Sequence, residues 1–375
     1  TAVLSSATDV AFDEFICTPR ATDTLRLTFL FWNYTVEPRR VDIGVRSLIN
    51  DKILIPAMDV PSFKIFRARQ IQRQNFVMVK VWGGLGDQIC SEPAIRFALN
   101  NFKNQKISLS AKNPELFQHL HDRFEEVFNA DKDPVNYDNY LTVDSMCNPQ
   151  HLLWAFCSHM VIHPVDFPSI LMWQRTLPNS DKEIQLPDFA PTEKVKSALE
   201  DPYNTVVVHF GASMPSKTFP LEWCERMVAS FKARGFKVVL IGKEVDEKVS
   251  YVKVNGEGCV DLRDNLSMQE FVWLLKNCKF LFSNDSSPIH AAAAGDAFIG
   301  MVSSIKHPDY LFHWRKGQFG YKTKNFGLDG AWNHVDCSPV QDKDLDLTIL
   351  IGVTWDKILP RTDDVADYYS RLRGS

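Results

Sequence analysis

Residues 76–99 have the sequence FVMVKVWGGLGDQICSEPAIRFAL, and this stretch decides the fold class. Its first six residues form a continuous apolar run with the length of a buried strand. A glycine-rich turn follows, and apolar residues then recur at helical spacing. Residues 106–109 have the composition of the next strand. A strand, a helix and a second strand in this order predict a parallel sheet covered by helices.

The same alternation returns after residue 205 and predicts a second Rossmann-like domain. One helix in it starts with a capping box, because Glu270 follows Ser267 at the third position. Gly295 is expected to end the helix of residues 288–294. Residues 362–373 are expected to form a closing helix. Strands are expected at residues 205–210, 237–241, 259–262, 280–283 and 297–301.

The first 75 residues have a different pattern, with short β-branched or aromatic runs separated by Asn, Pro and Asp. This pattern predicts a small all-β domain. The fold class is therefore predicted as α/β, with two Rossmann-like domains behind a small all-β domain. The predicted domains are the β domain 1–75, a first Rossmann-like domain 76–195, a second Rossmann-like domain 196–345 and the closing segment 346–375.

Composition narrows the class of protein. The 375 residues are 45% hydrophobic and 23% charged with a net charge of −4, which excludes a disordered, collagen-like or polycationic chain. The eight cysteines contain no C-x-x-C pair and predict reduced thiols rather than a disulfide framework or a zinc knuckle. No apolar run is long enough to span a bilayer, and the start lacks a signal-peptide pattern, so a cytoplasmic protein is expected.

The turn after the first strand offers the first candidate for chemistry. It contains Gly84, Gly86 and Asp87, but Ile89 stands where a dinucleotide fingerprint needs its third glycine. No Gly-Lys-Ser/Thr follows either, so the turn is not a Walker A loop. Asp87 at the mouth of the sheet has two interpretations. One is a base that takes a proton from a substrate hydroxyl, and the other is a cap for the helix.

The second candidate is the turn Ser283–His290, which again links a strand to a helix. Ser286 or Ser287 would cap that helix, and the free N–H groups at its start suit a phosphate. His290, one turn further on, would add a donor. The alternative interpretation is an ordinary capped helix with a histidine facing the core.

Two weaker candidates lie in loops of the same predicted domain. Lys217 would neutralise a diphosphate, or it is an isolated surface lysine. Glu244 follows a strand and would bind ribose hydroxyls, or it lies in a solvated loop. Together with Asp285, these residues predict a nucleotide-diphosphate site on the second domain that faces the Asp87 carboxylate of the first.

A basic stretch precedes the first Rossmann strand and has two interpretations. It is either a solvated strand edge or a contact for an acceptor such as nucleic acid. The basic residues are Lys64, Arg67, Arg69 and Arg73.

No metal is predicted. Residues 342–344 match a D-x-D pattern, but many loops match it as well, and a metal site on a diphosphate would need the pattern at a strand end near the phosphates.

Three blocks of the sequence resemble the ADP-heptose:lipopolysaccharide heptosyltransferases, glycosyltransferase family 9, whose fold is GT-B. Residues 84–96 are similar to the family's G-x-GD…PALR start, and residues 216–223 to its K-x-WP-xx-W segment. Residues 284–293, NDSSPIHAAA, resemble its D-[ST]-G-xx-H-xAAA loop. The second block departs from the family pattern, since Phe219 replaces the usual Trp. In the third block, Ser287 stands at the position of the usual Gly.

The resemblance implies roles for individual residues. Asp87 matches the family's catalytic base and Lys217 its lysine on the donor phosphates. Glu244 lies near the ribose position. The family's donor loop matches Asp285, Ser286, Ser287 and His290.

The resemblance also implies a reaction and a role for each domain. Residues 1–75 would bind the acceptor or a partner, residues 76–195 would form the acceptor-side domain, and residues 196–345 would form the nucleotide-sugar domain. The expected function is an inverting, metal-independent transfer of a sugar from a nucleotide-diphosphate sugar to an acceptor hydroxyl, with no cofactor. The acceptor stays open between a glycolipid, a protein and DNA. The alternatives are a phage-type glycosyltransferase for hydroxymethylated DNA bases, a protein O-glycosyltransferase, and a non-catalytic module that binds a nucleotide sugar. Protein O-heptosyltransferases also carry an N-terminal β domain, but their C-terminal four-cysteine iron finger is lacking here, because only Cys337 lies beyond residue 300.

Overall fold

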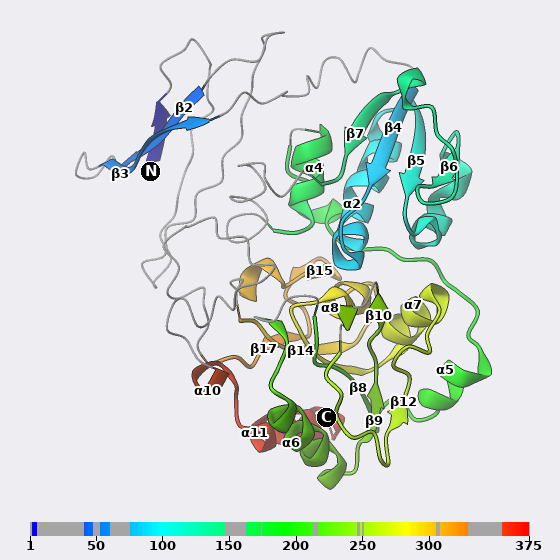
Figure 1. Ribbon diagram of the computed structural model, residues 1–375, viewed down its shortest axis with the longest axis vertical. Helices are drawn as coiled ribbons and strands as arrows, with labels where there is room; N and C mark the ends of the chain where they lie inside the picture. The colour runs from blue at the N-terminus through cyan, green and yellow to red at the C-terminus, as the bar shows by residue number, and fades with distance from the viewer. Residues whose placement is uncertain are drawn as a thin grey trace.

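The computed structural model describes most of the chain after residue 75 (Figure 1). Before that point it describes the backbone of three strands, β1 (Ala2–Ser5), β2 (Val41–Ser47) and β3 (Ile53–Val60), paired antiparallel in this order. The predicted all-β domain otherwise lies outside the described residues and stays a prediction. The described ranges are 76–146, 163–173, 175–212, 217–245, 248–249, 251–304, 308–328 and 355–374.

The first α/β unit is built on a four-stranded parallel sheet in the order β6-β5-β4-β7. The apolar run of the sequence forms its central strand, and helix α2 (Leu85–Asn101) returns the chain to the neighbouring strand. The predicted βαβ opening is therefore confirmed. Its strands are β4 (Phe76–Val81), β5 (Lys106–Ala111), β6 (Val127–Asn129) and β7 (Leu141–Asp144), and its other helices are η1 (Pro114–Arg123), η2 (Tyr137–Asn139) and α4 (Asp166–Trp173).

The second unit contains a six-stranded parallel sheet in the order β12-β9-β8-β13-β14-β17. The order runs outward from the middle in both directions, as in doubly wound folds. The predicted strands are all present, with ends shifted by one or two residues. They are β8 (Thr205–His209), β9 (Lys237–Leu240), β12 (Val260–Asp261), β13 (Phe280–Asn284) and β14 (Phe298–Val302). The sixth strand, β17 (Thr323–Asn325), was not predicted.

Helices cover this sheet, and two short hairpins project from it (Figure 1). The capping box of Ser267 and Glu270 opens α7 as predicted. The helices are α5 (Glu193–Ala198), α6 (Leu221–Ala233), α7 (Met268–Asn277), α8 (Ser287–Ala292), η4 (Asn179–Asp181), η6 (Pro308–Tyr310), α10 (Trp355–Ile358) and α11 (Thr362–Arg373). The hairpins are β10 (Glu244–Val245) with β11 (Lys248–Val249), and β15 (Trp314–Arg315) with β16 (Gln318–Phe319).

The closing helix α11 is part of the second core. Tyr369 is fully buried, and its hydroxyl donates a hydrogen bond to the Leu281 carbonyl oxygen at 2.6 Å. Gly300 of β14 makes room for this hydroxyl, because an added Cβ would lie 2.1 Å from it. The C-terminal helix therefore seals one face of the sheet, as the sequence pattern predicted.

Gly295 has a different role from the predicted one. Helix α8 ends with Ala293 at its C-cap, and Gly295 follows in a turn. A Cβ on Gly295 would lie 2.2 Å from the Lys276 carbonyl oxygen at the end of α7. The prediction of a helix-capping glycine is wrong, and the residue is small because two backbones approach closely there.

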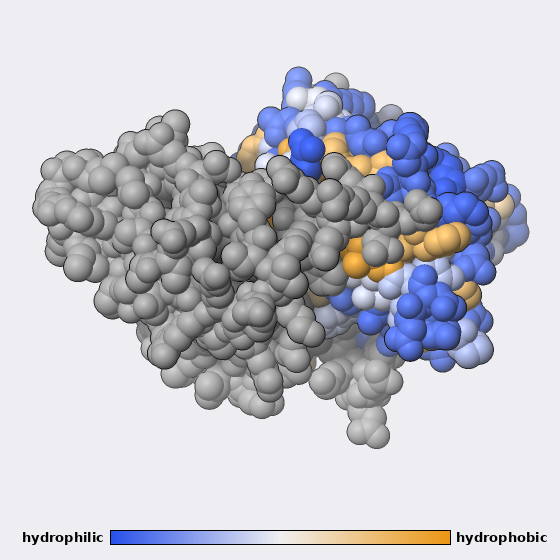
Figure 2. Space-filling model, turned by 90° about the horizontal axis from the view of Figure 1, so that it is seen from above, coloured by the Kyte–Doolittle hydropathy of each residue, from blue (hydrophilic) through white to orange (hydrophobic). Residues whose placement is uncertain are grey.

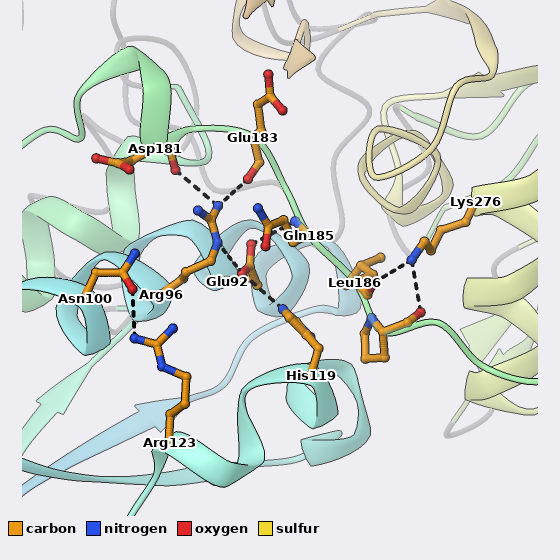
Figure 3. Close-up of polar contacts among 11 residues, drawn as sticks. Glu92, Arg96, Asn100, His119, Arg123, Asp181, Glu183, Gln185, Leu186 and Lys276 are labelled. Atoms are coloured by element: carbon orange, nitrogen blue, oxygen red, sulfur yellow. Dashed lines mark hydrogen bonds and ion pairs between the residues drawn. The ribbon is translucent and has the colours of Figure 1, made fainter. Parts of the chain in front are cut away.

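The segment between the two units is anchored first in the first unit (Figure 3). Glu92 of α2 is fully buried and accepts hydrogen bonds from Arg96 Nε at 2.8 Å and from the Gln185 backbone N–H at 2.9 Å. Arg96 Nη2 donates to the Glu183 carbonyl oxygen at 2.5 Å. A buried ion pair of α2 thus holds the backbone of residues 183–185.

The same segment is anchored in the second unit three residues later (Figure 3). Lys276 of α7 donates to the Leu186 carbonyl oxygen and to Asp188 Oδ1, both at 2.6 Å. We call residues 183–188 the linking segment. Its contacts with α2 and α7 fix how the two units are joined.

The described surface is mainly hydrophilic in the view of Figure 2 and carries a few small groups of hydrophobic residues. In the part of the chain that the structure describes, no helix has both the length and the apolar character needed to cross a membrane. One large hydrophobic side chain that stays exposed is Trp82, directly before the glycine-rich turn.

Candidate functional site

The candidate donor loop follows β13 and leads into α8. Asn284, the last residue of β13, is buried, and its Nδ2 donates to the carbonyl oxygens of Gly211 at 2.9 Å and Lys217 at 2.5 Å. Its Oδ1 lies 3.2 Å from His209 Nδ1, at the end of the neighbouring strand β8. Asn284 therefore fixes the loop after β8 to the loop after β13. The sequence block of residues 284–293, which begins with Asn284, did not predict this role.

Lys217 is brought to the donor loop by this arrangement. Its Nζ lies 2.7 Å from Asp285 Oδ2, and both side chains are largely buried. The alternative interpretation of Lys217 as an isolated surface lysine is therefore wrong. A buried ion pair of this kind places a cation next to the start of α8, with its charge balanced by a carboxylate.

The two serines of the loop lie at the beginning of α8. Ser286 occupies the N-cap position, but its side chain makes no capping hydrogen bond, and Pro288 stands in the first turn. Ser286 and Ser287 are both half-buried. The prediction that one of them caps the helix is confirmed for the position of Ser286 and not for a side-chain bond.

The glycine-rich turn carries Asp87 at the start of α2. Gly83 has a φ of 95°, a conformation that favours glycine, and Gly84 is the N-cap. Asp87 Oδ2 accepts a hydrogen bond from the Gly84 backbone N–H at 2.9 Å, and the side chain is half-buried. The capping interpretation of Asp87 is therefore present in the structure, and its role as a base stays a prediction.

The two candidate loops touch each other. A Cβ added to Gly86 would lie 2.9 Å from His290 Cδ2 and 3.6 Å from Ser287 Cα. The start of α2 in the first unit therefore packs directly against the start of α8 in the second. The sequence predicted this meeting, since both turns follow the carboxyl ends of parallel strands.

His290 is buried in this contact. Its Nδ1 lies 2.8 Å from His313 Nε2, and the two rings meet edge to face. His313 in turn packs edge to face against His163, whose Nε2 hydrogen-bonds the Phe312 carbonyl oxygen at 2.9 Å. His290 is thus held by a second imidazole that no sequence motif indicated.

His313 lies in an environment that disfavours its charged form. Burial, followed by the neighbouring His290, His163 and Arg315, lowers the pKa of His313 well below its usual value. Its imidazole is therefore neutral at physiological pH. Arg315 is buried as well, and burial lowers its pKa from the ordinary range.

The remaining candidates cannot be placed at the site. Glu244 opens β10 after β9, and its side chain lies outside the described residues. The basic stretch also lies outside them, so its contact with an acceptor stays a prediction. Its members are Lys64, Arg67, Arg69 and Arg73.

Comparison with known families gives a match for the second half of this site. The sequence profile of Glycosyltransferase family 9 (heptosyltransferase) matches residues 150–300. This range contains Lys217 and the loop of Asp285 and His290, and it begins after Asp87. The comparison with curated proteins gives no match.

Solved structures with a similar fold come from two bacteria. A family 9 glycosyl transferase from Veillonella parvula DSM 2008 has a TM-score of 0.55 and 11% identity, covering 80% of this chain and 97% of that one. The iron-containing dodecameric glycosyltransferase TibC from enterotoxigenic E. coli H10407 has a TM-score of 0.54 and 15% identity, covering 90% and 84%. TibC in complex with ADP-D-beta-D-heptose has a TM-score of 0.51 and 14% identity, covering 89% and 83%.

These likenesses agree with the two parallel α/β units described above and with a GT-B arrangement. The profile match and the three sequence blocks point to the same family. Residues 150–300 therefore match glycosyltransferase family 9, and this match identifies the protein as a glycosyltransferase.

Proposed function

We propose that this protein transfers a sugar, with inversion at the anomeric carbon, from a nucleoside-diphosphate sugar to an acceptor hydroxyl. Asp87 is the base in this proposal, and the loop of Lys217 and Asp285 holds the donor. The observation that carries the proposal is the contact of Gly86 with His290 and Ser287. It brings the carboxylate-bearing turn of one unit to the donor loop of the other.

Donor binding is supported by the charges of the loop. Lys217 forms an ion pair with Asp285, which lies two residues before the start of α8. In the proposal, the donor diphosphate takes over the interaction with Lys217 and gains stabilisation as negative charge builds on the leaving group. The hydroxyl groups of Ser286 and Ser287 lie at the same place and add donors.

The chemistry at the acceptor needs a base at the opposite side. Asp87 would take the proton of the attacking hydroxyl while that oxygen forms its bond to the anomeric carbon. The bond from that carbon to the diphosphate breaks in the same step, so the configuration inverts. The Gly84 N–H donates a hydrogen bond to Asp87 Oδ2 and so holds this carboxylate at the start of α2.

The proposed donor class is an ADP-linked heptose, supported by the likeness in fold to TibC, which was solved with ADP-D-beta-D-heptose. The proposed transfer uses no divalent metal on the diphosphate, since Lys217 supplies the positive charge.

Trp82, exposed before the glycine-rich turn, donates its indole N–H to Asp144 Oδ1 at 3.1 Å. An aromatic face beside a carboxylate suits an acceptor that carries hydroxyl groups.

The test is a mass-spectrometric screen of sugar nucleotides against glycolipid, protein and hydroxymethylated DNA acceptors, without added Mg²⁺ or Mn²⁺. The expected result is a mass increase of one sugar on one acceptor class, with the product's anomeric configuration inverted by NMR. Nucleotide binding without transfer to any acceptor would instead identify a non-catalytic module. Retention of configuration would exclude the proposed role of Asp87.

A further inference from the structure

Three side chains of metal-binding types cluster next to the contact between the two candidate loops. Cys90 comes from α2, His290 from α8, and His313 from the segment before β15. They are 1%, 6% and 2% exposed. One potential ligand atom from each side chain lies within 4.8 Å of the others.

We propose that Cys90, His290 and His313 bind one divalent transition-metal ion of the Zn²⁺ class, which joins the two α/β units. The inference does not depend on the proposed function, because it concerns what holds the units together. It departs from the sequence-based prediction of no metal. The ion proposed here is structural, and in this proposal His290 is a metal ligand rather than a hydrogen-bond donor to the diphosphate.

The geometry of the three ligand atoms suits a small ion. Atoms that are at most 4.8 Å apart surround a point no more than about 2.8 Å from each of them. Zinc sites have metal–sulfur distances of about 2.3 Å and metal–nitrogen distances of about 2.0–2.1 Å. Side-chain shifts of about 0.5 Å for the sulfur atom and about 0.8 Å for the two nitrogen atoms therefore bring the cluster to bonding distance.

One nitrogen in the cluster has an unused capacity to bind. His313 Nδ1 is buried and has no hydrogen-bond partner among the described residues, whereas Nε2 of the same ring lies 2.8 Å from His290 Nδ1. Leaving a polar atom buried without a partner costs about 1–3 kcal/mol. Coordination of the ion through His313 Nδ1 would remove that cost.

The kind of ligand selects the kind of metal. A thiolate and two imidazoles favour Zn²⁺ and similar ions, whereas Mg²⁺ and Ca²⁺ require oxygen ligands that the cluster does not offer. Cys90 binds as a thiolate, so one proton passes to solvent for each ion bound. Its negative charge offsets part of the ion's charge next to Arg315.

The position of the cluster gives the ion a structural effect. Cys90 follows Gly86 by four residues on α2, and the two residues share the helix face that packs on α8. His163 steadies the third ligand from outside, because its ring packs against His313 and bonds the preceding carbonyl oxygen. The bound ion therefore ties α2 to α8 one turn away from the candidate site.

The first test is elemental analysis of the full chain purified without chelators, followed by replacement of the ion with Co²⁺. We expect about one equivalent of metal per chain and a thiolate-to-cobalt absorption band. Cys90→Ser and His313→Gln should each lose the band and most of the metal. Cys278→Ser is the matched control, because this buried cysteine lies in the same core and outside the cluster.

Wild-type protein supplies a second measurement that needs no folded variant. A strong chelator should lower the Tm, and added Zn²⁺ should restore it. A wild-type chain without metal, without a cobalt–thiolate band and without a chelator effect overturns the proposal. Metal that survives in both Cys90→Ser and His313→Gln also overturns it, since the ion would then be held by other residues.

Discussion

Asp87 Oδ2 accepts a hydrogen bond from the Gly84 backbone N–H at 2.9 Å, so the proposed base also caps its own helix. Removal of the side chain would therefore disturb both the chemistry and the turn. A variant that keeps an acceptor oxygen and loses the negative charge separates the two roles.

Asp87→Asn is that variant. We expect turnover to fall by about 10²-fold or more, because general-base catalysis is lost, while the cap and donor binding are retained. Single-turnover kinetics and calorimetry with the nucleoside diphosphate measure the two effects. Asp122→Asn, a change to an exposed carboxylate of η1 in the same unit, is the matched control for a loss of charge. Full turnover in Asp87→Asn would remove this residue from the mechanism.

Lys217→Ala should weaken donor binding by about 10- to 100-fold, since a charge-assisted contact contributes about 1.5–3 kcal/mol. The structure adds that the variant leaves Asp285 without its cation, which increases repulsion of a diphosphate. Calorimetric titration with the nucleoside diphosphate gives the Kd. Lys243→Ala changes an exposed lysine at the same end of the sheet and should leave the Kd unaltered.

Gly86→Ala tests the contact between the loops. The added methyl group would lie 2.9 Å from His290 Cδ2, which forces α2 away from α8 and costs about 1–3 kcal/mol. Gly84→Ala is the control, because its nearest neighbour would be Asp87 Oδ2 at 3.4 Å and its φ is −66°. We expect the Tm and the turnover number to fall in Gly86→Ala and to stay unchanged in Gly84→Ala. Equal Tm values and turnover numbers for the two variants would show that the close contact of Gly86 with His290 is unimportant.

Glu270 makes the stability of the second unit pH-dependent. Burial raises its pKa, but hydrogen bonds from Thr192, the Ser267 backbone and Lys194 outweigh this effect and lower the pKa from 4.5 to about 2. The ionised group therefore stabilises the fold above pH 4.5, and this stabilisation is lost as the pH falls toward 2. In Glu270→Gln the decline of unfolding free energy over this window should be shallower, by up to about 1.4 kcal/mol per pH unit. Parallel profiles for both proteins would contradict the assignment.

Local sequence patterns predicted the elements whose ends carry their own signals. The capping box at Ser267 and the glycine-rich turn at Gly84 were predicted in this way. The strand β17 was missed, because its three half-buried residues Thr323–Asn325 are polar and show no apolar alternation. Tertiary pairing with β14 decides their conformation.

The candidate site was predictable in its two loops and not in what surrounds them. Asp87 and His290 are far apart in the sequence, but strand-end topology predicted that their turns meet. The contact of His290 with His313 joins two segments without a shared motif, so only the folded chain reveals it. Gly295 was misinterpreted for a similar reason, since the backbone that excludes its side chain belongs to another helix.

The linking segment has a consequence for substrate exchange. Residues 183–188 are hydrogen-bonded to Arg96 of the first unit and to Lys276 of the second, so this connection is not a flexible linker. Separation of the units would strip Arg96 or Lys276 of carbonyl acceptors, at about 1–3 kcal/mol for each group left unpaired. Under the proposed function, we therefore expect a sugar nucleotide to enter through small rotations of the units about this segment rather than through a wide opening.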